Sequence, residues 1–170
     1  MLTPRVFTIT DDSGFLAIVN ADRYNSFVSE NWEFPQLLNH FIDEMNKNHI
    51  IIWATGSENK WTINFSEAPT NANPFREFSK TIEVTDGRLF LANYEDLTMA
   101  AQFMDEKIPA THNSSLFVQL NNGKYEITVR QLFDAENYIG DFEREVDFEI
   151  IVETGSKKVP DAISQIFWWR

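Results

Sequence analysis

The sequence predicts a mainly β domain of the α+β class, an antiparallel β-sandwich-like fold with one amphipathic helix packed on it. Most of the chain alternates apolar and polar residues with a period of two, which is typical of half-buried strands. One segment, from Phe34 to about Asn46, instead repeats its apolar residues at the helical period. Because no repeat, low-complexity stretch or linker interrupts the 170 residues, we expect a single globular domain spanning 1–170.

Two strands are expected before the helix. "RVFTIT" and "FLAIVN" flank "DDSG", where Gly14 supplies the conformational freedom of a turn. The helix then places its apolar residues on one face, at Phe34, Leu37, Leu38, Phe41, Ile42 and Met45. Pro35 is tolerated only in a first turn, so the helix should begin near Phe34. Packed on a sheet, it should bury Leu38 and Phe41 most deeply.

Three hairpins are predicted after the helix. The first joins "HIIIWAT" to "KWTINFS" through "GSEN". The second turns at Asp86-Gly87 within "SKTIEVTDGRLFLANY", and the third turns at Asn122-Gly123 within "SLFVQLNNGKYEITVRQLF". Both glycines should have positive φ. "EAPTNANP" and "DEKIPATHNS" are expected to be loops, and "EDLTMAAQF" fits either a short helix or a strand.

A long strand is predicted over "DFEREVDFEIIVE", and its carboxylates fall at every second residue. One parity holds Asp141, Glu143, Glu145, Asp147 and Glu149, and the other holds Phe142, Arg144, Val146, Phe148 and Ile150. Successive side chains of a strand point to opposite faces. We therefore expect the five acids to form a solvent-facing row, while the apolar residues of the other parity point to the core.

Several interpretations of this acidic row are open. It can be a solvated face that keeps an edge strand from pairing with other chains, and a cross-strand base such as Lys124 or Arg130 could neutralise it. It can also be the docking face for a strongly basic partner. A divalent cation site is less favoured, because a flat strand rarely surrounds an ion with six to eight oxygens.

The chain end, "VPDAISQIFWWR", is predicted to form one helical turn beginning at Pro160. Its large apolar residues, Ile166, Phe167, Trp168 and Trp169, would promote association if they were exposed. We expect this tail to dock on its own domain or to be buried in a homodimer.

Composition excludes several classes of protein. The formal net charge of −12 repels nucleic acid and anionic lipid, so direct binding to either is not expected. The absence of cysteine excludes disulfides and thiolate chemistry. The N-terminal residues do not resemble a signal peptide, and the longest apolar run, "IIIWA", is too short to span a membrane. These features favour a cytoplasmic protein.

No motif in the chain points to catalysis or to a cofactor. The three histidines, His40, His49 and His112, have no metal-binding spacing, and solvated or helix-capping roles are expected for them. There is no glycine-rich phosphate loop and no G-x-S-x-G elbow. The sequence therefore favours a protein that is not an enzyme and that has no metal or cofactor.

Two parts of the chain are similar to a known family. "WEFPQLLNHFIDEMNKNHIIIWATGSENKWTINF" combines a tryptophan, a helix and a hairpin, and "KTIEVTDGRLFLANY" is followed further on by "QLNNGKYEITV". In this order the segments resemble the competence protein J family, small inhibitors of a DNA-entry nuclease. The resemblance implies a β-rich fold and protein-inhibitor activity, and it agrees with an acidic surface that can occupy a basic substrate groove.

The leading hypothesis is an acidic, non-enzymatic binding protein of bacterial type. It would inhibit or neutralise a basic protein partner, such as a nuclease or a toxin, as immunity proteins do. The alternative is a small-molecule-binding β-sandwich or barrel that uses aromatic residues such as Trp53 and Trp61, for which core packing is also expected. A third alternative is an enzyme whose site is assembled from residues far apart in the sequence.

Overall fold

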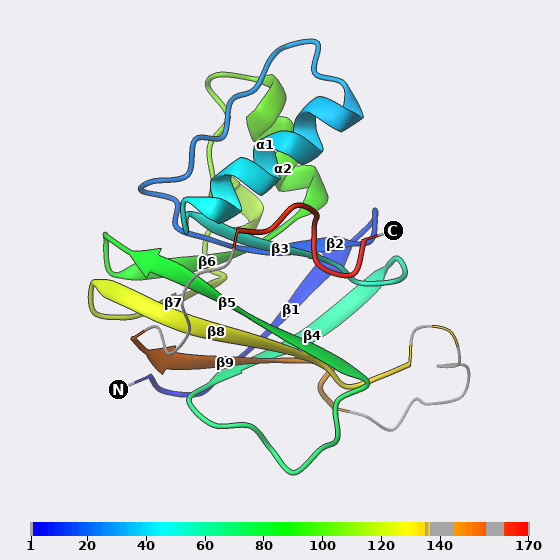
Figure 1. Cartoon of the computed structure of the whole chain (residues 1–170), viewed down its shortest axis with the longest axis vertical. Helices are drawn as coiled ribbons and strands as arrows, with labels where there is room; N and C mark the ends of the chain where they lie inside the picture. Colours follow the sequence, from blue (N-terminus) through cyan, green and yellow to red (C-terminus); the bar gives the residue numbers. More distant parts are fainter. Residues whose placement is uncertain (1, 135, 137–144, 156–161, 170) are drawn as a thin grey trace.

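Two sheets pack face to face, and two helices cover the outer face of the smaller sheet, in the part of the chain that the structure describes (Figure 1). This computed structural model describes residues 2–134, 136, 145–155 and 162–169. The order of the five-stranded sheet is β1 (Arg5–Asp11), β4 (Asn59–Ser66), β9 (Phe148–Thr154), β8 (Gly123–Gln131) and β5 (Arg76–Val84). The order of the four-stranded sheet is β3 (Ile50–Ala54), β2 (Phe15–Val19), β6 (Arg88–Asn93) and β7 (Phe117–Gln119).

The two helices are α1 (Phe34–Asn46) and α2 (Tyr94–Gln102), and a short 3₁₀ helix spans Thr111–Asn113. The predicted class, a mainly β sandwich with an amphipathic helix packed on it, is confirmed, although β4 and β9 pair in parallel and a second helix is present. The ambiguous segment "EDLTMAAQF" contributes most of α2, whose first turn is capped by the Asn93 side chain accepting from the Asp96 amide at 2.9 Å. None of the described helices has the length and hydrophobicity needed to cross a membrane.

The three predicted hairpins are wrong, although their turns are present. The strands on either side of each turn belong to different sheets, so β3 passes to β4, β5 to β6, and β7 to β8 across the sandwich. The turn between β1 and β2 crosses in the same way. A turn signal between two half-apolar strands predicts reversal of the chain. It does not determine whether the strands pair or bury their apolar faces against each other.

The glycines at these turns behave as predicted. Gly87 has φ +79° and Gly123 has φ +149°, backbone angles that residues with a side chain rarely adopt. Asn122 ties the two turns together at one end of the sandwich, because its Oδ1 accepts from the Gly87 amide at 2.9 Å and its Nδ2 donates to the Thr85 carbonyl at 3.0 Å. The other two crossing turns lie together at the opposite end (Figure 1).

The sandwich has two cores, which explains the continuous apolar runs in β2 and β3. Alternate residues of these strands face different layers: Leu16 and Trp53 pack between the two sheets, whereas Ala17 and Ile52 pack under the helices. All five residues of each strand are buried. Strands covered on both faces lose the period-two pattern and become apolar throughout.

Helix α1 has the predicted bounds, but its most buried face is rotated from the one expected. Phe41 is fully buried as predicted, whereas Leu38 is only half-buried, and Leu37 has 0% exposure. Residues 37, 41 and 45 are spaced four apart and form the stripe that faces the sheet. Leu38 lies to one side of this stripe, beside Ile166 and Trp169 of the C-terminal tail.

The C-terminal tail docks on its own domain, as predicted. The Ala54 amide donates to the Phe167 carbonyl at 2.9 Å, and Phe167 forms a parallel bridge with Trp53, so the tail extends the edge of β3 (Figure 1). The ring of Phe167 stacks on Phe78 with centroids 3.8 Å apart. Residues 162–169 contain no helix, and the start of the predicted helical turn at Pro160 lies outside the described residues, so that turn stays a prediction. Burial in a homodimer stays a prediction.

Replacing Leu37 with Ala should destabilise the fold more than replacing Leu38 with Ala. Leu37 is fully buried between α1 and the sheet, so we expect its loss to cost about 2–5 kcal/mol of unfolding free energy. Replacing the half-buried Leu38 with Ala should lower the unfolding free energy clearly less. Chemical denaturation of the two matched variants measures the difference, and equal losses would contradict the face assigned to α1.

Deleting residues 166–170 should lower the melting temperature. The deletion removes the chain that bonds to the edge of β3 and uncovers the ring of Phe78. Sedimentation velocity of the full-length and shortened chains tests the dimer at the same time. A melting temperature that does not change would mean that the docked tail contributes nothing to stability.

Candidate functional site

The predicted acidic row lies at the boundary of the described residues. Asp141 and Glu143 lie outside them, as do Phe142 and Arg144. Glu145 is exposed, as expected. Asp147 is half-buried, and its Oδ2 accepts from the Thr62 amide at 2.8 Å, which ties it to β4 just before β9 begins. The described strand therefore starts at Phe148, later than predicted.

Glu149 was predicted to face solvent, and this is wrong, because only 1% of it is exposed. The reason is that β9 is the central strand of the five-stranded sheet and not an edge. The outer face of this sheet is covered at Glu149 by the loop 67–75, which lies across it (Figure 1). The Thr70 amide of this loop donates to Glu149 Oε1 at 3.3 Å. The even-numbered Phe148 and Ile150 point into the core, as predicted.

Arg130, one of the two cross-strand bases considered from the sequence, neutralises Glu149. The two residues are opposite each other in the β8–β9 ladder and form a buried ion pair. Arg130 also lies 3.3 Å from the Glu77 carboxylate and donates to the Ala72 carbonyl at 2.6 Å. A buried charge is tolerated only when it is paired and hydrogen-bonded in this way. Glu149 is thus a structural residue in this fold.

Trp53 and Trp61, the proposed aromatic ligand residues, are both fully buried between the sheets. Trp61 stacks on Phe133 with centroids 4.8 Å apart and meets Phe148 edge-on at 5.5 Å. Core packing, the other role expected for them, is what the structure shows.

A cavity of about 430 Å³ opens where the crossing turns β1–β2 and β3–β4 meet the C-terminal tail. We call it the aromatic cavity. Its lining includes two partly exposed rings, Phe75 (49%) and Trp169 (37%), and the carboxylate residues Glu58 and Glu136. Ser57 also belongs to this lining, and its hydroxyl is buried without a hydrogen-bond partner in the described part of the chain.

Arg76 forms the inner wall of the aromatic cavity. Its guanidinium lies 4.2 Å from the ring centroid of Trp168, and it donates to Gln131 Oε1 at 2.9 Å and to the Ala54 carbonyl at 3.3 Å. Trp168 has φ +65°, an uncommon conformation for a bulky residue. This left-handed residue redirects the chain so that Trp169 packs on Phe15, with ring centroids 5.1 Å apart.

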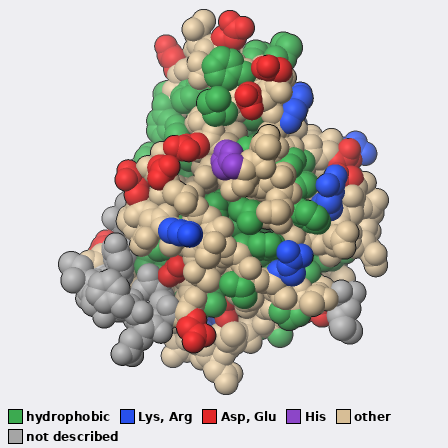
Figure 2. Space-filling view, turned by 180° about the vertical axis from the view of Figure 1, so that it is seen from behind, with side chains coloured by type: hydrophobic (Ala, Val, Ile, Leu, Met, Phe, Trp, Pro, Cys, Tyr) green, Lys and Arg blue, Asp and Glu red, His purple; other side chains and the backbone are tan. Residues whose placement is uncertain are grey.

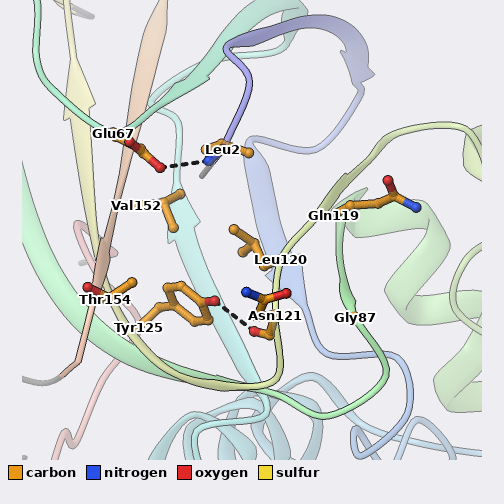
Figure 3. A pocket seen from close by; sticks show the side chains of 9 residues that line it. All are labelled: Leu2, Glu67, Gly87, Gln119, Leu120, Asn121, Tyr125, Val152 and Thr154. Carbon is orange, nitrogen blue, oxygen red and sulfur yellow. Dashed lines mark hydrogen bonds between the residues drawn. The ribbon is translucent and has the colours of Figure 1, made fainter.

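A second cavity, of about 380 Å³, lies close to the N-terminal residues (Figure 3). Leu120 and Val152 supply apolar lining, and two hydrogen bonds close parts of its wall: the Leu2 amide to Glu67 at 2.6 Å, and the Tyr125 hydroxyl to the Asn121 carbonyl at 2.7 Å. Burial raises the pKa of the Tyr125 hydroxyl, so this group stays a neutral donor at physiological pH. The residues drawn in Figure 3 contain no nucleophile paired with a base.

One acidic group was missed in the sequence because its members are far apart in the chain. Asp12 from the β1–β2 turn meets Glu95 at the start of α2, and a hydrogen bond between the two side chains raises the pKa of the Glu95 carboxyl, which in its protonated form donates to Asp12. The neighbouring Asp96 is buried and lies 3.1 Å from His112. On the face seen in Figure 2, acidic side chains form several separate groups rather than one row.

The histidines have local partners. His49 lies 3.3 Å from the buried Glu44, and His40 Nε2 lies 2.6 Å from the Asn25 carbonyl. Among the described residues, no group of three or more His, Asp or Glu side chains could hold a metal ion.

No family model and no curated protein sequence matches the chain. Solved structures with a similar fold include "Crocagin biosynthetic gene J", with a TM-score of 0.60 and 13% identity over 92% of this chain and 99% of that chain. They also include ComJ from Bacillus subtilis, described as an inhibitor of the DNA degrading activity of NucA, with a TM-score of 0.52 and 13% identity over 91% of this chain and 99% of that one. The resemblance to a competence protein J-type inhibitor is therefore confirmed at the level of the fold.

Proposed function

We propose that this chain is a non-enzymatic binding protein that inhibits a basic protein partner, of which a nuclease is the leading example. The observation that carries the proposal is the fold shared with ComJ over nearly the whole length of both chains. ComJ is described as inhibiting the DNA degrading activity of NucA. Fold alone does not determine function, so the charge and surface of this chain must support the proposal independently.

The charge of the chain supports a basic partner. The formal net charge is −12, and the buried carboxylates have internal partners that keep them out of any interface. Glu149 pairs with Arg130, and Glu44 contacts His49 and Lys47. The excess negative charge is therefore carried largely by exposed residues such as Glu58, and it would attract a positively charged protein and repel nucleic acid. A nuclease carries a basic substrate groove, which such a surface could occupy.

The small-molecule alternative loses its original basis, because Trp53 and Trp61 are buried in the core. The acids of the segment before β9 remain the predicted partner contact. Within the set predicted from the sequence, Asp141, Glu143 and Glu145 can serve this purpose, whereas Asp147 and Glu149 have structural bonds.

Affinity capture at low ionic strength should identify the partner. We expect the immobilised chain to retain a protein of net positive charge from its native host and to release it as NaCl is raised. The purified protein should then degrade DNA, and adding the chain should suppress that activity. A column carrying an unrelated protein of similar net charge is the control. Retention of the same protein by both columns, or nuclease activity that the chain does not change, would contradict the proposal.

Changing Asp141→Asn, Glu143→Gln and Glu145→Gln together should slow association with the captured partner by roughly 3- to 10-fold at low salt. The dissociation rate and the unfolding free energy should change little. Stopped-flow association and chemical denaturation measure these quantities. Unchanged association would show that these acids are not part of the interface.

Glu149→Gln is the matched control, because it removes the same charge from a buried position of the same region. It leaves the Arg130 guanidinium without its buried carboxylate, so the unfolding free energy should fall by about 3–5 kcal/mol. Where the variant remains folded, its association rate should change less than that of the triple variant. If the association rate of the Glu149→Gln variant falls more than that of the triple variant, Glu149 belongs to the interface.

A further inference from the structure

We propose that the aromatic cavity is the receptor for an arginine side chain of the basic partner. This inference rests on the proposed function and adds to it a defined contact, at a site that is separate in sequence from the acidic segment 141–149. The cavity is built by the β1–β2 turn, the β3–β4 turn, Phe75 and Arg76 where β5 begins, Glu136 after β8, and the C-terminal tail. Its volume of about 430 Å³ is adequate for a side chain and insufficient for a folded element.

The aromatic rings favour a flat cation. Phe75 and Trp169 keep 49% and 37% of their surfaces exposed although they line a cavity, so part of each side chain is open to a guest. Arg76 lies 5.9 Å from the Phe75 ring centroid, and Trp169 packs on Phe15, so a guest would meet the remaining surface of each ring. A guanidinium stacks on aromatic rings and is less strongly hydrated than an ammonium, which makes arginine a better guest than lysine. The fold already uses this contact in the wall of the same cavity, where the Arg76 guanidinium lies 4.2 Å from the ring centroid of Trp168 and 5.9 Å from that of Phe75.

The charges around the cavity favour a cation as well. Glu58 and Glu136 both belong to the lining, and neither forms an ion pair with a residue in the described ranges. Arg76 contributes one positive charge, but its guanidinium is directed to Trp168, Gln131 and the Ala54 carbonyl. Among the described lining residues, two carboxylates thus stand against one guanidinium, which leaves an excess of one negative charge.

A polar group that lacks a partner completes the site. The Ser57 hydroxyl is buried and makes no hydrogen bond within the described part of the chain, and a buried polar group without a partner is costly. The guanidinium of a guest has five N–H donors, and the hydroxyl can accept from one of them once the Ser57 side chain turns toward the cavity. A lining that combines aromatic rings with carboxylates matches the composition of an interface anchor site, in which an arginine fills a partly dry pocket.

The direct test uses two small probes that differ in charge but hardly in shape. N-acetyl-arginine amide and N-acetyl-citrulline amide are titrated into the folded chain, and the indole N–H signals of its five tryptophans are followed by NMR. We expect the arginine probe to shift the signals of Trp168 and Trp169 in a saturable way, while those of the buried Trp53 and Trp61 stay constant. Equal shifts with citrulline, or no shift at Trp168 and Trp169, would overturn the inference.

Two variants and a control connect the shift to the cavity. Glu58→Gln should weaken the arginine probe by about two- to five-fold, the effect expected of one exposed ion pair. Phe75→Ala should also weaken it, and this exposed ring can be removed with little effect on the core. Glu106→Gln makes the same chemical change at an exposed position after α2, outside the cavity lining, and should have no effect. Equal weakening by Glu58→Gln and Glu106→Gln would indicate a general charge effect and would overturn the inference.

The same variants separate this inference from the function on which it rests. In the nuclease assay, Glu58→Gln and Phe75→Ala should reduce inhibition by the chain, whereas Glu106→Gln should not. Full inhibition by all three variants would refute the arginine receptor and leave the inhibitor proposal intact. If the unmodified chain inhibits no captured partner, the proposed function fails, whatever the probes do.

Discussion

The buried carboxylate of Asp11 fixes the place where the chain passes from one sheet to the other. Only 1% of Asp11 is exposed, and its two oxygens accept from five donors: the amides of Ser13, Gly14 and Phe15, the Thr55 hydroxyl and the Trp61 indole. These five donors satisfy a buried carboxylate that has no base beside it. One side chain thereby joins the β1–β2 turn, the end of β3 and the core of β4, and it shapes the end of the sandwich at which the aromatic cavity opens.

Buried and surface carboxylates of this molecule have different surroundings, and the difference suggests different roles. Carboxylates inside the fold have dedicated partners, as Glu149 has in Arg130 and Asp96 has in Asn113, which donates at 2.7 Å. Carboxylates at the surface lack enough bases to balance them, since the chain holds 26 acidic and 14 basic residues. The buried carboxylates are therefore paired as the stability of the fold requires, whereas the excess negative charge of the surface attracts cationic partners.

Local features could be predicted from the sequence, and long-range ones could not. The bounds of α1 follow from its period and from Pro35, and the glycine turns follow from their composition. Sheet membership did not follow, because a period of two shows that a strand has an apolar face and not which strand lies beside it. Glu149 appeared exposed for the same reason: its partner Arg130 and its covering loop lie elsewhere in the sequence. The aromatic cavity draws on five separated segments, so no local pattern could indicate it.

The crossing turns have a consequence for how this chain folds. In the described sheets, no two hydrogen-bonded neighbouring strands are joined by a tight turn. Even β8 and β9, which are consecutive in the chain and paired in the sheet, are separated by residues 132–147. A hairpin can therefore not form early and serve as a template for later strands. Every ladder requires closure of a long loop before any hydrogen bond compensates for the lost entropy, which places such topologies among slow-folding proteins. Since each crossing links both sheets, we expect the two layers to assemble in one cooperative step.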